Sequence, residues 1–546
     1  MNSFRIIAVL SLVAGCSDGE VLKCPAVVAL DSGTSGCRPA DGGGASVDSG
    51  CHSVAASDGG TCECRTSDAG GLSIDGGSCP VASDPFPGVD RVWSFGGAKT
   101  DNGLALAFDG EDSFIVAGSF QETADLDPGP GRDEHTAESV GGSGTFLVKL
   151  RADGSFSWAR TFPGGATNQV AVATSGTDLF FAQGSGNDLS SRRASSLTHL
   201  SATGEPLWTV TYPEDRTQVF ALAANGAGEV FVAGSYNYAT VDLDPGPGVE
   251  SHTTSGIAGF VSKFSSGGQH LWSRTFELGD FDPYKGAYAL RLDREGRPVL
   301  AGGGRIVLED VQASAPGVFV IKYDEQGTLL WVRLLAEGAF RPAASALDID
   351  SANDIILVSN FQYGQVPQDF DPGEGIDLQP NETTAFGDFL GFISKISANG
   401  TYRWTRTIGM GVGVAAPSPR VFATALAVTP QDRIVVGGYF QGAVDFMPGP
   451  AVDFRVVLGN EYSADLYVAQ FDGQGRYLWA RSAGGVPRLS AIQVSALAVD
   501  HQGRASFTGV CPATLEWQDS ISWFGDQNPP SISSAGWDDT LLLRFR

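Results

Sequence analysis

The chain is poor in basic residues, histidine and methionine. It has 35 Lys and Arg against 62 Asp and Glu, which gives a formal net charge of −27 at pH 7, and only 6 His and 3 Met. A surface that binds phosphate needs clustered Lys and Arg, so the composition excludes nucleic acid as a partner. Acidity of this size otherwise acts mainly on solubility.

The sequence also has no recognisable catalytic set. It has no Gly-x-Ser-x-Gly elbow placed between a strand and a helix and no phosphate-binding loop. None of its histidines stands in a nucleophile or metal motif, so no catalytic, cofactor-binding or metal residue is assigned. The histidines are His52, His135, His199, His252, His270 and His501.

Long apolar runs are missing too. After the N-terminus, no apolar run approaches the ~18 residues expected of a membrane-spanning helix. The first 15 residues, in contrast, look like an export signal: Arg5 supplies a short basic region, and residues 6–13 form a short apolar core. We therefore expect residues 1–15 to be a signal peptide.

The four residues Val13-Ala14-Gly15-Cys16 resemble the lipobox of bacterial lipoproteins. In that family the cysteine is diacylated and becomes the mature N-terminus, so the resemblance implies a lipid anchor on Cys16. Ser17 follows, rather than Asp, which by the same resemblance implies the outer membrane. The alternative is ordinary cleavage that leaves a free cysteine.

Residues 16–89 differ in composition from the rest of the chain. They repeat Asp-small-Gly, contain few aromatic residues and show no periodicity, so we predict a disordered spacer that cannot bury a core. An even set of cysteines in an exported chain indicates up to three disulfides, with fifteen ways to pair them. A zinc site is the alternative, but the spacing is irregular and only His52 is near. The cysteines are Cys24, Cys37, Cys51, Cys62, Cys64 and Cys79.

From residue 90 onward one phrase, Lys-x4-Gly-x3-Trp, organises the chain. In its first copy an apolar strand ends near Lys149, Gly154 allows a tight turn, and the returning strand carries Trp158. A lone hairpin is marginal in water, so six near-copies imply units that stack on one another. The other copies are Lys263/Gly268/Trp272, Lys322/Gly327/Trp331, Lys395/Gly400/Trp404, His199/Gly204/Trp208 and Gln470/Gly475/Trp479.

Two further strand-like runs precede each phrase, and they occur seven times. In each pair a short turn joins the two runs. The residues that open these turns are Asp109, Ser175, Asn225, Asp293, Asp350, Thr429 and Asp500. With the two strands of the phrase, each unit has four strand-like runs. Residues 541–546 form the third run of a unit that lacks its fourth, and residues 92–97 form the fourth run of a unit that lacks its third. We predict that residues 92–95 pair with residues 540–545, with Arg544 at the position of Lys149 and Trp93 at that of Trp158.

This count predicts an all-β fold for residues 90–546: a seven-bladed β-propeller with four antiparallel strands per blade, closed by the N-terminal strand. The alternation of an apolar-Lys run, a Gly turn and an aromatic strand resembles the bacterial seven-bladed propeller repeat family. The Gly-x3-Trp spacing is also similar to the docking phrase of quinoprotein-type propellers, which typically have eight blades. We expect equivalent, largely buried positions for Trp93, Trp158, Trp208, Trp272, Trp331, Trp404 and Trp479.

The long connections fall on one face of such a propeller, and loops usually carry binding. Several of them hold Asp-x-Asp-Pro-Gly, which we interpret as a Pro-Gly type II turn whose Asp side chains cap the backbone. Calcium held by the carboxylates is the alternative and would be the only cofactor. The candidate carboxylates are Asp125 with Asp127, Asp242 with Asp244, and Asp369 with Asp371, and Asp445 begins an eroded copy.

The sequence thus favours a lipid-anchored protein of the bacterial envelope, periplasmic or exposed on the cell surface. We expect it to bind a protein or glycan through the long-loop face, or to act as a scaffold, without catalysis. The alternative is a propeller enzyme with its site in the central funnel, a lyase or a quinoprotein-like oxidoreductase. His199 replaces a repeat Lys and Cys511 follows a strand, so we expect structural roles for both.

Overall fold

Besides a few short strands before residue 74, the computed structural model describes residues 88–545, except 139–141, 164–168, 185–193, 213–215, 280–285, 339, 363–367, 374, 379–388, 410–419, 448–452, 458–462, 485–493, 513–515 and 518–537. The chain divides into two compact units, Met1–Pro85 and Phe86–Arg546. The described part contains strands and no helix. Accordingly, it offers no helix with the length and apolar character needed to cross a membrane.

In the first unit the structure describes only the short strands. They pair in twos: β1 (Val13–Gly15) with β2 (Val21–Lys23), β3 (Val54–Ala55) with β4 (Thr61–Cys62), and β5 (Arg65–Thr66) with β6 (Leu72–Ser73). Cys62 therefore lies in β4. The other cysteines of the signal and spacer, including Cys16, lie outside the described residues.

The second unit is built from antiparallel meanders of four strands, and three of them form separate sheets. The first comprises β8 (Asn102–Phe108), β9 (Phe114–Gln121), β12 (Ser143–Leu150) and β13 (Phe156–Pro163). The second comprises β14 (Val170–Ser175), β15 (Asp178–Gln183), β16 (Ser196–Leu200) and β17 (Pro206–Thr211). The third comprises β24 (Gly286–Leu292), β25 (Pro298–Gly304), β28 (Gly317–Tyr323) and β29 (Leu329–Leu335).

Other meanders belong to larger sheets. β18 (Thr217–Ala224), β19 (Val230–Asn237), β22 (Ile257–Phe264) and β23 (His270–Glu277) are extended by β26 (Val307–Leu308) and β27 (Val311–Gln312). The next meander comprises β30 (Phe340–Ile349), β31 (Ile355–Gln362), β32 (Phe389–Ile396) and β33 (Tyr402–Ile408). The meander after it comprises β34 (Arg420–Val428), β35 (Ile434–Gln441), β38 (Asp465–Phe471) and β39 (Tyr477–Gly484), and β42 (Glu516–Trp517) extends it. A single bridge between β32 and β34 joins these two meanders into one sheet.

The last large sheet joins the two ends of this unit. It contains β40 (Val494–Val499), β41 (Ala505–Pro512), β43 (Asp538–Phe545), β7 (Val89–Gly97), β10 (Thr123–Asp125) and β11 (Glu134–Thr136). Two small hairpins, β20 (Thr240–Asp242) with β21 (Ser251–Thr253) and β36 (Ala443–Asp445) with β37 (Phe454–Val456), complete the set.

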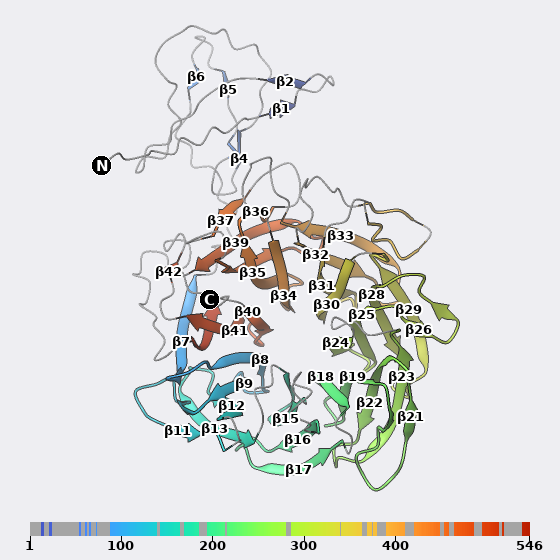
Figure 1. Ribbon diagram of the computed structural model, residues 1–546. Coiled ribbons are helices and arrows are strands. Elements are labelled where there is room, and N and C mark those ends of the chain that lie inside the picture. The colour runs from blue at the N-terminus through green and yellow to red at the C-terminus, as the bar shows by residue number, and fades with distance from the viewer. Residues whose placement is uncertain are drawn as a thin grey trace. The chain divides into compact units, whose positions relative to one another are not determined.

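The sheets lie around a common centre, with the first strand of each meander innermost and the fourth at the periphery (Figure 1). Each first strand contacts the first strands of its two neighbours, and β40 contacts β8. The second and third strands are almost fully buried, as in β9 and β22, because neighbouring sheets cover both of their faces. The apolar clusters accordingly combine residues of adjacent sheets. The chain is thus all-β, and its arrangement is consistent with a propeller-like fold.

The predicted pairing of the two ends is confirmed. β43 and β7 are antiparallel, with Thr540 opposite Phe95 and Leu543 opposite Val92. The register we expected was wrong by two residues: Arg91, not Trp93, faces Arg544, as Trp158 faces Lys149. This shift also explains why Trp93 stands two residues closer to its following Gly pair than Trp479 does.

The tryptophans join each meander to the next. A methyl group added at Gly204 would lie 3.0 Å from the Trp158 ring, and one at Gly154 would lie 2.0 Å from the Trp93 ring. Trp93 therefore covers the next turn glycine in spite of its shifted register. None of the seven rings is exposed: Trp479 is buried, at 7% exposure, and the other six are half-buried.

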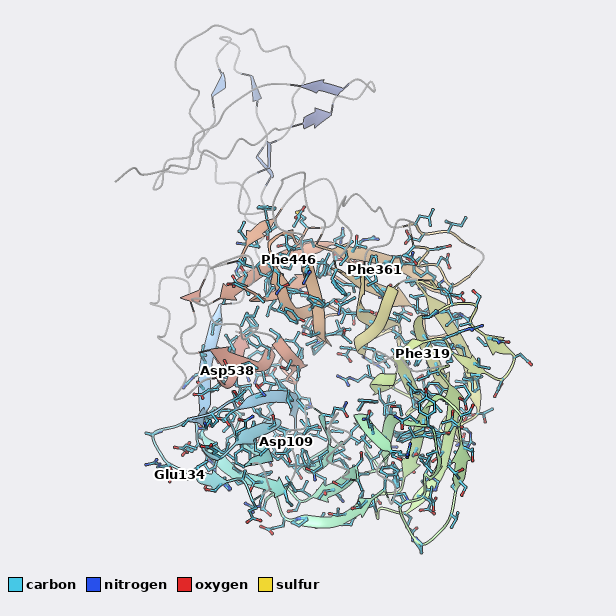
Figure 2. The ribbon with its side chains drawn as sticks, in the orientation of Figure 1. Asp109, Glu134, Phe319, Phe361, Phe446 and Asp538 are labelled. Carbon is cyan, nitrogen blue, oxygen red and sulfur yellow. The ribbon has the colours of Figure 1, made fainter. Side chains whose placement is uncertain are left out.

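The repeated Lys is buried beside a carboxylate that opens the first turn. Nζ of Lys149 lies 2.6 Å from Asp109, Nζ of Lys322 lies 2.8 Å from Asp293, and Nζ of Lys395 lies 2.6 Å from Asp350. Asp109 is labelled in Figure 2. Lys149 and Lys322 also donate to carbonyl oxygens of the next meander, those of Ala202 and Ala398. Arg544 donates in the same way to the carbonyl of Ala152, across the junction of the chain ends.

Candidate functional site

The Asp-x-Asp-Pro-Gly loops form capped turns. In the first copy, Oδ1 of Asp125 accepts N–H bonds from Asp127 (3.2 Å) and Asp133 (2.9 Å), and Oδ1 of Asp127 accepts one from Gly129 (2.7 Å). The carboxylates therefore satisfy backbone donors of their own loop, as the capped-turn interpretation predicts.

The second copy repeats these bonds. Oδ1 of Asp242 accepts N–H bonds from Asp244 (3.0 Å) and Glu250 (2.8 Å), and Oδ1 of Asp244 accepts one from Gly246 (2.8 Å). A methyl group at Gly248 would lie 2.1 Å from Oδ2 of Asp244, so this carboxylate lies against its own loop. Asp244 thus caps the chain of its own loop.

The third copy has the same geometry. Oδ1 of Asp369 accepts the N–H groups of Asp371 and Asp377, and Oδ1 of Asp371 accepts that of Gly373. In the described residues, no group of three His, Cys, Asp or Glu side chains could hold a metal. The six calcium candidates all lie in these capped turns: Asp125, Asp127, Asp242, Asp244, Asp369 and Asp371.

The detail of this turn differs from our expectation. A type II turn needs a positive φ at its glycine, and Gly129, Gly246 and Gly373 are not among the residues with positive φ. The glycine two positions later is the constrained one, since a methyl group at Gly131 would lie 2.2 Å from Oδ2 of Asp127. The carboxylate folds over the chain there, which only glycine permits.

Three of these loops also attach their meander to the previous one. Asp125 pairs with Gly96 of β7, and the backbone N–H groups of Ala336 and Gly409 donate to the carbonyls of Asp369 and Asp445. The acidic loops therefore cover the ends of the preceding fourth strands, where unpaired backbone groups would otherwise remain. We assign them a structural role.

The innermost strands carry little chemistry. At one equivalent position of the first strand, two neighbouring meanders have Arg291 and Asp348. The other five meanders have alanine there: Ala107, Ala173, Ala223, Ala427 and Ala498. Nε of Arg291 lies 3.6 Å from Oδ1 of Asp348, and Oδ2 of Asp348 accepts the N–H of Val428 at 2.8 Å. Burial raises the pKa of Asp348, and the Arg291 charge opposes this shift. No histidine lies on the described first strands.

His199, which we predicted to be structural, is packed among repeat residues. His199 is 6% exposed and stacks on Phe180, with ring centroids 4.5 Å apart. His135 and His252 each bridge an acidic side chain of the hairpin and a threonine of the fourth strand. Because the same arrangement occurs twice, it belongs to the repeat. Cys511 pairs with Asp539 across β41 and β43, and its side chain lies outside the description.

One carboxylate has a strongly shifted acidity. Burial raises the pKa of Asp101 to about 7, and the negative charge of Asp539 adds to this, against hydrogen bonds from the N–H groups of Gly97 and Gln121. Such a value suits a general acid. Asp101, however, is 0% exposed, and its own N–H donates to the carbonyl of Asp538, labelled in Figure 2. Asp101 therefore connects β7 and β43 by hydrogen bonds, and its buried carboxyl group is not accessible to a substrate.

Three aromatic residues lie together where β32, β34 and β35 meet. The Phe422 ring lies 5.0 Å from that of Phe389 and 4.6 Å from that of Tyr439, nearly parallel to the latter at 18°. All three rings are half-buried, and we call them the aromatic stack. Arg420 is exposed, is opposite Phe389 in the bridge between β32 and β34, and shares a strand face with Phe422.

The stack lies at the long-loop end of the meanders. Phe389 and Arg420 begin their strands directly after connections, and Tyr439 stands near the end of β35. The other meanders place mainly small or polar residues at the position of Tyr439, among them Ser119, Ser235 and Asn360. A cluster of half-buried aromatic rings with a cation at its rim can bind a ring-shaped ligand. Sequence reasoning missed it, although the break in the repeat was a signal.

Comparisons with known proteins show no family. No protein-family model matches the chain. A stretch of 172 residues, 31% of this chain, is 23% identical to an uncharacterized WD repeat-containing protein of Acanthamoeba polyphaga mimivirus and spans 12% of that relative's length. This likeness agrees with a propeller-like fold.

The similar solved structures are distant. A protein of unknown function from Dyadobacter fermentans is 10% identical, with 85% of this chain and 100% of that chain covered and a TM-score of 0.35. A neuraminidase-like protein from a bat isolate of Guatemala is 9% identical, with 66% and 90% covered and a TM-score of 0.32. Scores this low carry no argument about ligand or activity.

Proposed function

We propose that the protein is a lipid-anchored, closed seven-bladed β-propeller that binds a glycan on its long-loop face without catalysing a reaction. The meanders supply the blades, and β7 supplies the fourth strand of the last one. Support for closure comes from the pairing of β7 with β43 and from the contact of β40 with β8. Radial closure of this sort leaves only short, protected strand edges.

The aromatic stack is the observation that carries glycan binding. Sugar rings present C–H groups that pack on the electron-rich faces and edges of aromatic rings, and polar groups at the rim orient their hydroxyls. Phe389, Phe422 and Tyr439 supply the rings, and Arg420 and Gln441, which face each other across β34 and β35, supply the rim. A catalytic role in the funnel has less support, because Arg291 and Asp348 are paired with each other there.

Replacing Phe422 by Ala should weaken glycan binding about tenfold, because it removes the central ring of the stack. Phe162→Ala is the matched control: Phe162 is a half-buried ring stacked on Phe181 at 4.6 Å, on the peripheral strand β13. Binding is measured on a glycan array and then by calorimetry. Equal losses in the two variants, or no glycan bound by the wild type, would refute the proposal.

The anchor is proposed on the lipobox resemblance of Cys16, and it places the protein in the bacterial outer membrane. Cys16→Ala should abolish incorporation of labelled palmitate and release the protein from membranes, since two acyl chains are enough for stable anchoring. A Cys24→Ala variant controls for general effects of losing a thiol. Unchanged labelling of Cys16→Ala would contradict the lipoprotein assignment.

A further inference from the structure

A buried carboxyl group connects the two strands that join the chain ends. Asp101, which directly precedes β8, accepts the N–H of Gly97 in β7 at 2.5 Å through Oδ2 and the N–H of Gln121 in β9 at 3.1 Å through Oδ1. Its own N–H donates to the carbonyl of Asp538, the first residue of β43, at 2.8 Å. Since no turn links β7 to β43, Asp101 fixes the end of one strand to the start of the other.

A second carboxyl group lies beside that of Asp101. A methyl group added at Gly96 would lie 2.7 Å from Oδ2 of Asp101 and 2.8 Å from Oδ1 of Asp539. The two oxygens therefore approach the same point on one side of β7, which glycine leaves open. Both residues are buried, at 0% exposure for Asp101 and 3% for Asp539. Burial disfavours a negative charge on Asp101, and a negative charge on Asp539 disfavours it further.

The surroundings of Asp101 offer it no cation within the described part of the chain, where it makes no ion pair. The ammonium of Lys99, two residues away, lies 3.6 Å from Glu122 instead. Burial and the charge of Asp539 raise the pKa of Asp101 to about 7, against two backbone N–H bonds. The titratable residues at this end of the neighbouring elements are Lys99, Glu122, Asp125 on β10, Cys511 on β41, and Asp538 and Asp539 on β43.

We propose that Asp101 and Asp539 form a proton-dependent clasp on the junction of the chain ends. With a proton on Oδ2 of Asp101, this O–H group can donate to Oδ1 of Asp539, and β7 is held firmly against β43. When Asp101 releases the proton to water, two negative charges face each other beside Gly96, and the pairing of β7 with β43 weakens. The junction is therefore tighter in a mildly acidic medium than in an alkaline one.

Folding raises the pKa of Asp101 from 3.8 to about 7, so the folded protein binds more protons than the unfolded chain between these values. The stabilisation that this proton gives is complete below pH 3.8 and is lost as the pH rises to about 7. We therefore expect Asp101 to raise the equilibrium constant of unfolding about a hundredfold between pH 5 and pH 8.

Hydrogen exchange locates the effect, and urea titration gives its size. Both are measured on the full mature protein between pH 5 and pH 8, and the exchange rates are corrected for their intrinsic dependence on pH. We expect amide protection in β7 and β43 to fall with rising pH more than protection in β28, which belongs to another meander. Protection at the junction that does not change with pH overturns the clasp, whether or not any variant folds.

Three variants assign the proton. Asp101→Asn keeps the shape of the side chain without its titration, so the rise from pH 5 to pH 8 should be about a hundredfold smaller than in the wild type. Asp539→Asn removes the second charge and should move the midpoint of the change to lower pH. The matched control is Asp348→Asn, because burial raises the pKa of Asp348 too, but this residue lies in β30 beside Arg291. A rise that persists in Asp101→Asn and disappears in Asp348→Asn overturns the proposal, as does an unchanged midpoint in Asp539→Asn.

Discussion

A chain that begins at residue 98, and so lacks β7, should lose cooperative unfolding and aggregate. β7 pairs with β43 from Val89 to Phe95 and also carries β10 at Gly96 and Gly97. Its removal exposes the apolar strand β43, all eight residues of which are buried, as an open edge. It also deletes the buried Val89 and Phe95, each worth about 1.5–3 kcal/mol. Together these losses rival the ~5–15 kcal/mol stability of an ordinary domain.

The matched control is a chain that begins at Phe86, the first residue of the second compact unit. It keeps β7 and should unfold like the mature protein in calorimetry and remain monomeric in gel filtration. If the chain that begins at residue 98 is equally stable and monomeric, then β7 is dispensable and the closed seven-bladed model fails.

Replacing Lys149 by Gln should destabilise the protein by about 3 kcal/mol. The ammonium lies 2.6 Å from Asp109, whose side chain is 0% exposed, so the variant leaves a buried carboxylate without its cation. It also loses the bond to the carbonyl of Ala202, 3.4 Å away. The free energy of unfolding is measured by urea titration.

Another repeat of the same chain shows which second substitution should compensate for the loss of Lys149. Where Gln470 replaces the repeat Lys, Thr429 replaces the turn Asp, and both are buried: Gln470 accepts the indole N–H of Trp479 at 3.1 Å. The double variant Asp109→Thr/Lys149→Gln reproduces this neutral pair and should recover most of the lost stability. A double variant as unstable as the single one would show that the charge pair is not the cause.

Turn chemistry let the sequence predict the hairpins. Gly154 has φ of 82° and Gly204 has φ of 79°, as a glycine that closes a type I turn with a bulge requires. Because turn length sets the register of a hairpin, the fixed spacing goes with one register, in which Lys149 is opposite Trp158. No turn links β43 to β7, so nothing local set their register, and there the expected position of Trp93 was wrong.

The sequence contained a signal for the partners of the repeat Lys, which the sequence analysis did not use. Lys149 and Asp109 are both charged, Gln470 and Thr429 are both neutral, and Lys263 meets Glu229 at 2.8 Å where Asn225 replaces the Asp. These changes occur together within one chain, which is the signature of contact.

By itself, the sequence determined an all-β chain of repeated antiparallel strands whose two ends complete each other, because strand alternation and glycine turns act over a few residues. Only the tertiary structure decided what lies at the long-loop end. Phe389, Phe422 and Tyr439 come from three strands, and their rings meet because β32 touches β34 through a single bridge. That contact depends on the packing of one meander against the next, which no local pattern encodes.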